Sequence, residues 1–272
     1  MIMLRQWINC LMILTSALIS PRALATQTIE AWSYYSSAPF QTDSATGAGL
    51  NADLVDYLNK ALAGKYEIRL VQLPRSRLTM LFDNGDHAFV LLAPSVVFGG
   101  PEGGAYLWTA PLVHDRQELI SRRDHPFEFE NPRSLTGVRF GAMQGHIYPD
   151  IAKEMESGEI RADRAYTEAS LISMLLARHV DVISLPNSTV RYYMRASPSF
   201  RQTAVISRLN LGEYNRHLIF QPTMTKEFED FNQVIRKMNN DPAWISTLEK
   251  YGLEPYHVPD GKKTESPSTK KR

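Results

Sequence analysis

The sequence lacks several features on which common functional classes depend. Its 272 residues include one cysteine, and 30 basic against 29 acidic residues leave a net charge of +1. A balance so close to neutral gives no reason to expect nucleic acid as a partner. No apolar run reaches the roughly twenty residues that a membrane-spanning helix needs. An ordinary share of apolar and aromatic residues, 43% and 10%, instead indicates a folded globular protein.

The first 25 residues have the layout of a cleavable secretory signal. Arg5 precedes the apolar run "WINCLMILTSALI", and Ala23 and Ala25 place small residues ahead of a cut before Thr26. The alternative, a membrane anchor, needs a longer run. We therefore expect export with cleavage after Ala25. Cleavage removes Cys10, so the mature chain would have no thiol for catalysis, metal ligation or a disulfide.

After the signal, strand-like and helix-like segments alternate. Leu50, Leu54, Leu58 and Leu62 recur at four-residue steps, which predicts an amphipathic helix that ends near Gly64. Strand-like segments include "TIEAWSYY", "YEIRLVQL", "HAFVLLA", "VRFGAM" and "VDVISL". This order predicts an α/β fold with mainly parallel sheets. Ligands of such sheets bind at the carboxyl ends of strands, in loops ahead of helices.

Motifs of catalysis and of metal or phosphate binding are missing from the sequence. The glycine-rich stretch "FVLLAPSVVFGGPEGG" at 89–104 has no Lys-Ser/Thr pair after it and contains two prolines, so it is not a phosphate loop. No two histidines lie three or four residues apart, as a helical metal site would require. There is no Gly-x-Ser-x-Gly elbow of a serine hydrolase. We assign no catalytic residue, metal or cofactor.

The segment "LPRSR" is the first candidate for ligand binding. Pro74 opens a short predicted helix, and Arg75 and Arg77 lie at its N-terminal end, where the helix dipole disfavours cations. One arginine that faces an anionic ligand would explain this placement. The alternative is a pair of arginines that are solvated or paired with a nearby carboxylate. On the first interpretation, Arg77→Ala would weaken ligand binding without unfolding the protein.

Two further stretches carry candidate ligand residues. Tyr34 and Tyr35 offer a stacking surface with a phenolic donor, and strand alternation predicts one in a cleft and one in the core. His146 follows Gly145 at a predicted strand-to-helix turn. It is a candidate hydrogen-bonding ligand residue; the alternatives are a loop residue without ligand contact and a catalytic base.

These pieces, in this order, resemble the periplasmic solute-binding proteins of the polar amino-acid uptake family (family 3, type II periplasmic-binding fold). The likeness covers roughly 28–254 and rests on "APF" before "GLNADLVDYLNKAL", on "LWTAPL", on "SLTGVRFGAMQG" and on "LLARHVDVIS". It implies a periplasmic protein with two α/β lobes, joined by two crossings, that close on a ligand. The boundaries it implies are a signal peptide at 1–25, a first lobe at 26–113 and 216–258, a second lobe at 114–215 and a disordered tail at 259–272.

The chain lacks the residues with which this family binds the two charged groups of an amino acid. Where the family has an arginine for the α-carboxylate, the loop 93–100 has Ser95 and Phe98 and no arginine. Where the family has an aspartate for the α-ammonium group, the loop 185–188 has Asn187 and no acid. A simple α-amino acid is therefore not the expected ligand. The expected ligand-binding residues are Tyr34, Tyr35, Arg75, Arg77, Ser95, Phe98, His146 and Asn187.

The resemblance implies a monomer that captures a small organic solute for ABC-type uptake or signalling. Its partners would be that small-molecule ligand and a membrane permease or a membrane sensor. One alternative is a periplasmic enzyme similar to cyclohexadienyl dehydratases, with His146 as general acid. Another is an interaction protein whose cleft is filled by Tyr34, Phe98 and the loop at Pro94.

Overall fold

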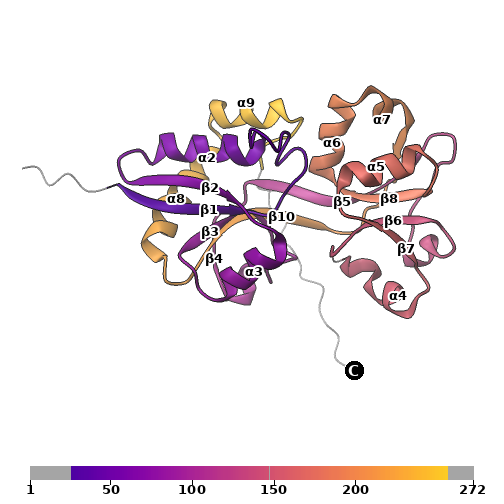
Figure 1. Ribbon diagram of the computed structural model, residues 1–272, viewed down its shortest axis with the longest axis horizontal. Coiled ribbons are helices and arrows are strands. Elements are labelled where there is room, and N and C mark those ends of the chain that lie inside the picture. The colour runs from indigo at the N-terminus through magenta and orange to yellow at the C-terminus, as the bar shows by residue number, and fades with distance from the viewer. Residues whose placement is uncertain (1–25, 147, 257–272) are drawn as a thin grey trace, which may run out of the picture.

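The computed structural model describes residues 26–146 and 148–256 (Figure 1). The expected signal peptide at 1–25 and the expected disordered tail at 259–272 lie outside the described residues. Within the described part of the chain, no helix has the length and apolar character to cross a membrane.

The first lobe is a sheet with helices on it. β1 pairs in parallel with both β2 and β3. The strands of this lobe are β1 (Gln27–Ser33), β2 (Tyr66–Gln72), β3 (Ala88–Pro94) and the short β4 (Leu107–Trp108). Its helices are α2 (Leu50–Ala61), α3 (Arg75–Asp83), α8 (Thr225–Met238) and α9 (Pro242–Lys250), with a 3-10 turn at Pro101–Gly103. In α2, Leu50, Leu54 and Leu58 are buried, as their spacing predicts.

The second lobe repeats this plan. β6 pairs in parallel with both β7 and β8. Its strands are β6 (Phe140–Met143), β7 (Ala162–Ala165), β8 (Val182–Pro186) and β9 (Ala204–Ile206). Its helices are α4 (Ala152–Ser157), α5 (Glu168–Leu176), α6 (Asn187–Ala196) and α7 (Pro198–Thr203), with 3-10 turns at Pro132–Leu135 and Pro149–Ile151. Thr167 caps α5 by accepting a hydrogen bond from the Ser170 N–H, as the sequence predicts.

Two long strands, β5 (Val113–Arg122) and β10 (Glu213–Phe220), connect the lobes. The first residues of β5 pair with β10, and its later residues pair with β8 and β9. The resulting strand order is β2-β1-β3-β10-β5-β8-β6-β7. Every antiparallel pairing of these strands involves β5 or β10. The predicted α/β fold with two lobes and two crossings is confirmed.

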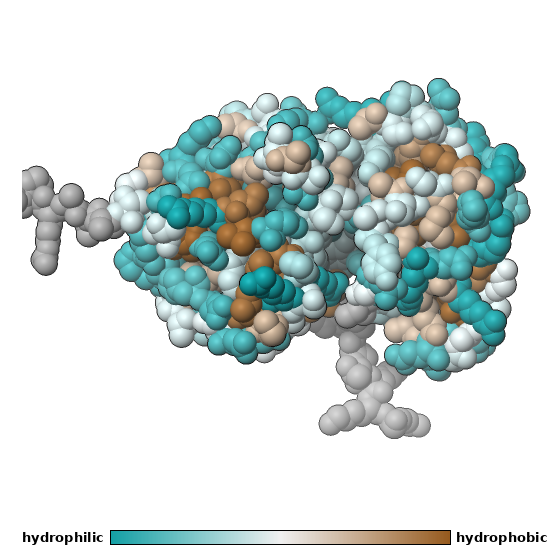
Figure 2. Space-filling view, viewed as in Figure 1, coloured by the Kyte–Doolittle hydropathy of each residue, from teal (hydrophilic) through white to brown (hydrophobic). Residues whose placement is uncertain are grey.

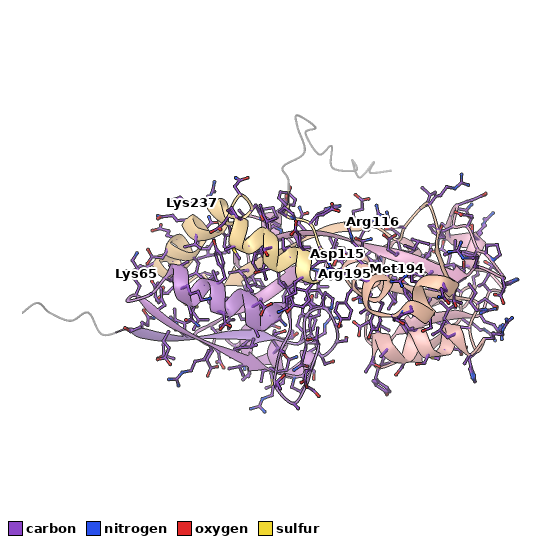
Figure 3. All side chains as sticks on the ribbon, turned by 90° about the horizontal axis from the view of Figure 1, so that it is seen from above. Lys65, Asp115, Arg116, Met194, Arg195 and Lys237 are labelled. Atoms are coloured by element: carbon purple, nitrogen blue, oxygen red, sulfur yellow. The ribbon has the colours of Figure 1, made fainter. Side chains whose placement is uncertain are left out.

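Each lobe has its own hydrophobic core. In the first lobe, Phe89 stacks on Phe220 with ring centroids 4.9 Å apart, and Phe231 packs against both rings. In the second lobe, Leu171 and Phe200 belong to a separate buried cluster. In the view of Figure 2, apolar residues gather on both halves of the molecule. Figure 3 places Asp115 and Arg116 mid-molecule, where β5 passes between the lobes. Separate cores allow two lobes to move as rigid bodies about a hinge.

Candidate functional site

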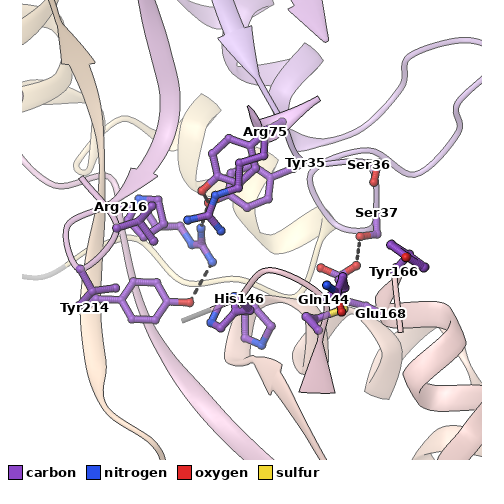
Figure 4. Close-up of a pocket in the computed structure, with 16 residues that line it drawn as sticks. Tyr35, Ser36, Ser37, Arg75, Gln144, His146, Tyr166, Glu168, Tyr214 and Arg216 are labelled. Atoms are coloured by element: carbon purple, nitrogen blue, oxygen red, sulfur yellow. Dashed lines mark hydrogen bonds between the residues drawn. The ribbon is translucent and has the colours of Figure 1, made fainter. Parts of the chain in front are cut away.

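A cavity of about 200 Å³ lies between the two lobes (Figure 4). The first lobe lines it with Tyr34, Tyr35, Ser37, Arg75, Pro94, Val96 and Val97. The second lobe lines it with Gln144, His146, Tyr166 and Glu168, and the crossing strand β10 adds Tyr214 and Arg216. Most of these residues follow the carboxyl ends of β1, β3, β6 and β7, which is where the alternating pattern predicts ligand-binding loops.

Arg216 is buried at this cavity, and its guanidinium is fully occupied by the protein. Its Nε and Nη2 both lie 2.7 Å from Oδ2 of Asp115, which is also buried. Nη2 donates to the Tyr214 hydroxyl at 3.1 Å, and Nη1 donates to the Tyr35 hydroxyl and to the Leu92 carbonyl. A guanidinium has five N–H donors, so these partners leave no free donor for a ligand.

Asp115 ties this arginine to the second lobe. Its carboxylate accepts hydrogen bonds from the Ser188 N–H at 3.1 Å and from the Ser188 hydroxyl at 2.7 Å. Ser188 belongs to the first turn of α6, whereas Arg216 belongs to β10. The buried ion pair therefore links the crossing strands to α6.

The backbone carbonyl of Leu92 is a further acceptor for the side chains around Arg216. Leu92 has a φ of 49°, in the left-handed region that a leucine rarely adopts. Its carbonyl accepts hydrogen bonds from the Tyr35 hydroxyl at 3.3 Å and from Arg216 Nη1 at 3.4 Å. The strained backbone of β3 thus presents an acceptor to the two side chains that line the cavity.

Arg75 differs from Arg216 in its partners, which are an aromatic ring and a backbone carbonyl. It is half-buried, its guanidinium lies 5.5 Å from the centre of the Tyr34 ring, and Nη1 donates to the Gly145 carbonyl at 3.4 Å. Within residues 26–146 and 148–256, no carboxylate forms an ion pair with Arg75. Arg77 does not line the cavity and is exposed. The placement of Arg77 in the cleft is therefore wrong, because α3 turns its side chain about 200° away from that of Arg75.

His146 lies where its environment keeps it neutral. Burial, followed by the positive charges of Arg75 and Arg216, lowers its pKa from 6.5 to about 4. Gly145 ahead of it has a φ of 73°, a conformation that glycine adopts without strain. The imidazole packs against the Tyr148 ring with centroids 4.6 Å apart. At neutral pH, it can offer hydrogen bonds to a ligand but does not act as an imidazolium acid.

Glu168 brings a carboxylate into the cavity from the second lobe. It is the first residue of α5, and it accepts a hydrogen bond from the Ser37 hydroxyl of the first lobe (Figure 4). In the described part of the chain, no cation pairs with it. The contact joins the lobes across the cavity.

Tyr34 and Tyr35 both line the cavity, although strand alternation predicts only one of them there, and Tyr35 also packs against the core of the first lobe as expected for the other. Their hydroxyls lie 3.0 Å apart, and the Tyr35 ring stacks on Phe40 at 4.2 Å between centroids. The reason is that β1 ends at Ser33. Beyond that residue the alternation of a strand no longer determines the direction of side chains.

Three other expected ligand residues do not line the cavity. Phe98 packs beside Tyr34 and Tyr106, at 6.4 and 6.5 Å between ring centroids. Asn187 donates to Glu118 at 2.6 Å, while its neighbour Pro186 lines the cavity. Ser95 is likewise absent from the lining, although the residues on both sides of it contribute.

The sequence interpretation missed Arg216, Tyr214, Glu168, Gln144 and Tyr166. A signal for the first two exists in "EYNRHLIF", since Tyr214 and Arg216 are two residues apart on one face of a strand. For Glu168, the signal is an acid directly after the strand-to-helix turn at 166–167. No cluster of three or more potential metal ligands occurs among the described residues.

Comparisons with known proteins identify the fold. No protein-family model matches the chain, and no curated protein matches its sequence. The structure is similar to a mutant of ArgBP from T. maritima, with a TM-score of 0.66 and 18% identity over 82% of this chain and 94% of that one. It is also similar to an ancestral arginine-binding protein bound to glutamine, with a TM-score of 0.63 and 14% identity over 82% and 97% of the two chains.

A third similar structure is an ancestral amino acid-binding protein described as a precursor of cyclohexadienyl dehydratase. Its TM-score is 0.64, with 14% identity over 83% of this chain and 95% of that one. These likenesses show the fold of the solute-binding proteins, which is the type II periplasmic-binding fold. At such low identity, the ligands of these proteins do not transfer to this chain.

Proposed function

We propose that this protein is a solute-binding protein that captures a small organic solute with an anionic group in the cavity between its lobes. The observation that carries the proposal is Arg75, a cation inside a cavity lined by both lobes, without a carboxylate partner among the described residues. A guanidinium in this state is suited to a carboxylate or phosphate group. Arg216 does not compete for that role because Asp115 neutralises it.

The cavity sets the size and character of the solute. Its volume of about 200 Å³ is below the roughly 300–1,000 Å³ of pockets for drug-sized ligands. Tyrosines 34, 35, 166 and 214 supply most of its aromatic lining. A small ligand with an apolar part would pack against these rings, and its anionic group would reach Arg75.

Closure of the lobes would trap the solute. The Ser37–Glu168 and Arg75–Gly145 hydrogen bonds join the two sides of the cavity. The proposed lobes, at 26–113 with 216–258 and at 114–215, would open at the crossings to admit the ligand and then close. We further propose that the protein is exported to the periplasm as a monomer and passes its solute, or its occupancy, to a membrane permease or sensor.

A simple α-amino acid remains excluded from this proposal. Arg75 reaches the cavity from α3, whereas the loop at 93–100 contributes only Pro94, Val96 and Val97. The loop that follows β8 contributes Pro186. The two charges of an α-amino acid lie about one carbon apart and would need partners that these two loops do not supply.

The competing function is an enzyme of the cyclohexadienyl-dehydratase kind, with His146 as general acid. A general acid needs a proton to donate at its working pH. The lowered pKa of about 4 leaves His146 neutral at pH 7. Binding without turnover therefore fits the cavity better.

Native mass spectrometry of protein purified from the cells that produce it tests the proposed function. We expect a small molecule bound one-to-one, and a thermal-shift screen of small carboxylates in which the ligand raises the melting temperature. Saturation at 100 times Kd stabilises the folded state by about 2.7 kcal/mol. Protein that is free of any small molecule and unresponsive in the screen would contradict the proposal. Turnover of a prephenate-like compound would favour the enzyme.

A further inference from the structure

The cavity contains two charged side chains, Arg75 and Glu168, whose charges no other residue in 26–146 and 148–256 compensates. Arg75 contacts a ring and a backbone carbonyl, and Glu168 accepts a hydrogen bond from the neutral Ser37 hydroxyl. Neither forms an ion pair with another described residue. Arg216 and Asp115 neutralise each other. The cavity as a whole is therefore close to neutral, but its positive pole, Arg75, and its negative pole, Glu168, are separate.

The two poles belong to opposite lobes and face different parts of the cavity. Arg75 comes from α3 of the first lobe, and Glu168 comes from α5 of the second. Figure 4 shows the Arg75 side chain beside Tyr35 and Arg216, whereas Glu168 lies on the far side of the cavity, next to Ser37. A ligand that satisfies both poles must carry opposite charges at separated positions.

We propose that the ligand is a zwitterion whose carboxylate and ammonium groups are several carbons apart, with the carboxylate bound by Arg75 and the ammonium by Glu168. This inference rests on the proposed function and assigns the ligand class of the same site. A plain monocarboxylate would satisfy Arg75 but leave Glu168 without a counter-charge in a partly buried place. Complementary charge on both sides of an interface is what selects one partner over another.

The aromatic lining fits the rest of such a molecule. Tyr166 is 83% exposed, lines the cavity and lies two residues before Glu168 in the chain. An aromatic face beside a carboxylate suits an ammonium group, which rings attract through their quadrupole. At the other pole, the Tyr34 ring already lies against the Arg75 guanidinium. The methylene chain of the ligand would cross between these rings.

Calorimetric titration with three probes tests the ligand class. We use δ-aminovalerate, its isomer norvaline, in which the ammonium is next to the carboxylate, and valerate, which lacks the ammonium. We expect δ-aminovalerate to bind about tenfold more tightly than either of the others, or better. Norvaline controls for composition and total charge, and valerate controls for the carboxylate and the carbon chain.

Two variants locate the ammonium site. Glu168→Gln keeps an acceptor for Ser37 but removes the charge, so it should weaken δ-aminovalerate about tenfold or more and leave valerate unchanged. Glu159→Gln is the matched control, because Glu159 is exposed in the second lobe and does not line the cavity. It should change neither affinity. A far-ultraviolet circular dichroism spectrum checks that both variants are folded.

The outcomes separate this inference from the proposed function. Equal affinities for valerate and δ-aminovalerate, with no effect of Glu168→Gln, would overturn the separated-charge class while a carboxylate site remained. Tighter binding of norvaline would overturn it in favour of an α-amino acid. If no probe binds, the ligand class is wrong, whereas the proposed function is judged independently by the small molecule carried by natively purified protein.

Discussion

Arg75 and Arg216 line the same cavity, yet their surroundings give them different roles. Arg216 is 1% exposed, and every N–H of its guanidinium meets an oxygen of the protein, including the Asp115 carboxylate. Arg75 is half-buried and has a ring and one backbone carbonyl as neighbours. A position on the wall of a cavity therefore does not make an arginine a ligand group. In the proposed function, Arg216 stabilises the fold because its charge is compensated, and Arg75 binds the solute because no described carboxylate compensates its charge.

The largest effect should come from breaking the buried pair. Asp115→Ala leaves the Arg216 charge buried without its partner and should lower the free energy of unfolding by about 3–5 kcal/mol. Arg75→Met removes no ion pair with a described residue and should lower the free energy of unfolding much less. Equilibrium unfolding in urea measures both. Comparable losses from the two variants would show that the contrast between the arginines is wrong.

A double replacement tests whether the charge balance of the Asp115–Arg216 pair accounts for the stability that Asp115→Ala loses. Asp115→Leu with Arg216→Met removes both charges, and apolar replacement of a buried pair is often close to neutral. The double variant should therefore regain most of the stability lost in Asp115→Ala. A double variant as unstable as the single one would mean that the hydrogen bonds of the pair, not its charge balance, dominate.

Acid should destabilise the protein through His146, which lies near both arginines. The unfolded chain binds a proton at this residue below about pH 6.5, whereas the folded chain does so only near pH 4. Stability is therefore lost as the pH falls from 6.5 to 4, by at most about 3 kcal/mol. His146→Asn should flatten this part of the stability profile. Parallel profiles for the variant and the original protein would contradict the lowered pKa.

The pKa of His146 also measures how close the Arg75 charge lies. Since the Arg75 charge is one cause of the lowered pKa, Arg75→Gln should raise the pKa of His146 in an NMR titration. An unchanged value would place the two side chains farther apart than the structure does.

A smaller effect is expected at the link between the ion pair and α6. Ser188→Ala removes the hydroxyl that donates to Asp115 at 2.7 Å, while the Ser188 N–H and Arg216 still contact the carboxylate. The free energy of unfolding should fall by about 1 kcal/mol. A loss of unfolding free energy as large as that of Asp115→Ala would mean that the Ser188 hydroxyl, and not Arg216, is the main partner that stabilises the Asp115 carboxylate.

The fold could be predicted from the sequence because its signals are local. The leucines of α2, the cap at Thr167 and the apolar strand β3 each depend on residues close in the chain. The alternation of strands and helices then leaves few possible architectures. The two lobes and the crossings were expected from the resemblance to the family of periplasmic solute-binding proteins.

The site was predicted only in part because its residues meet through long-range pairing. Arg75 and His146 could be found from their own turns. The strand pattern shows only that Arg216 shares a face with Tyr214, and the register of β10 against β3 and β5 is what brings Arg216 to the cavity. The local sequence shows Glu168 only as an acid after a strand-to-helix turn, and its place in the cavity depends on the approach of the two lobes at Ser37. Arg77 was chosen with Arg75, although two residues along a helix point to different sides.

The most direct test of the account is the affinity of the natively recovered ligand for Arg75→Gln and Arg77→Gln, measured by calorimetry. The two variants make the same chemical change two residues apart on α3, one inside the cavity and one exposed outside it. Loss of a charged hydrogen bond predicts binding weaker by about 10–100-fold in Arg75→Gln. Arg77→Gln should bind as tightly as the original protein. Equal affinities in both variants, or a loss confined to Arg77→Gln, would contradict the assignment of Arg75 as the group that recognises the solute.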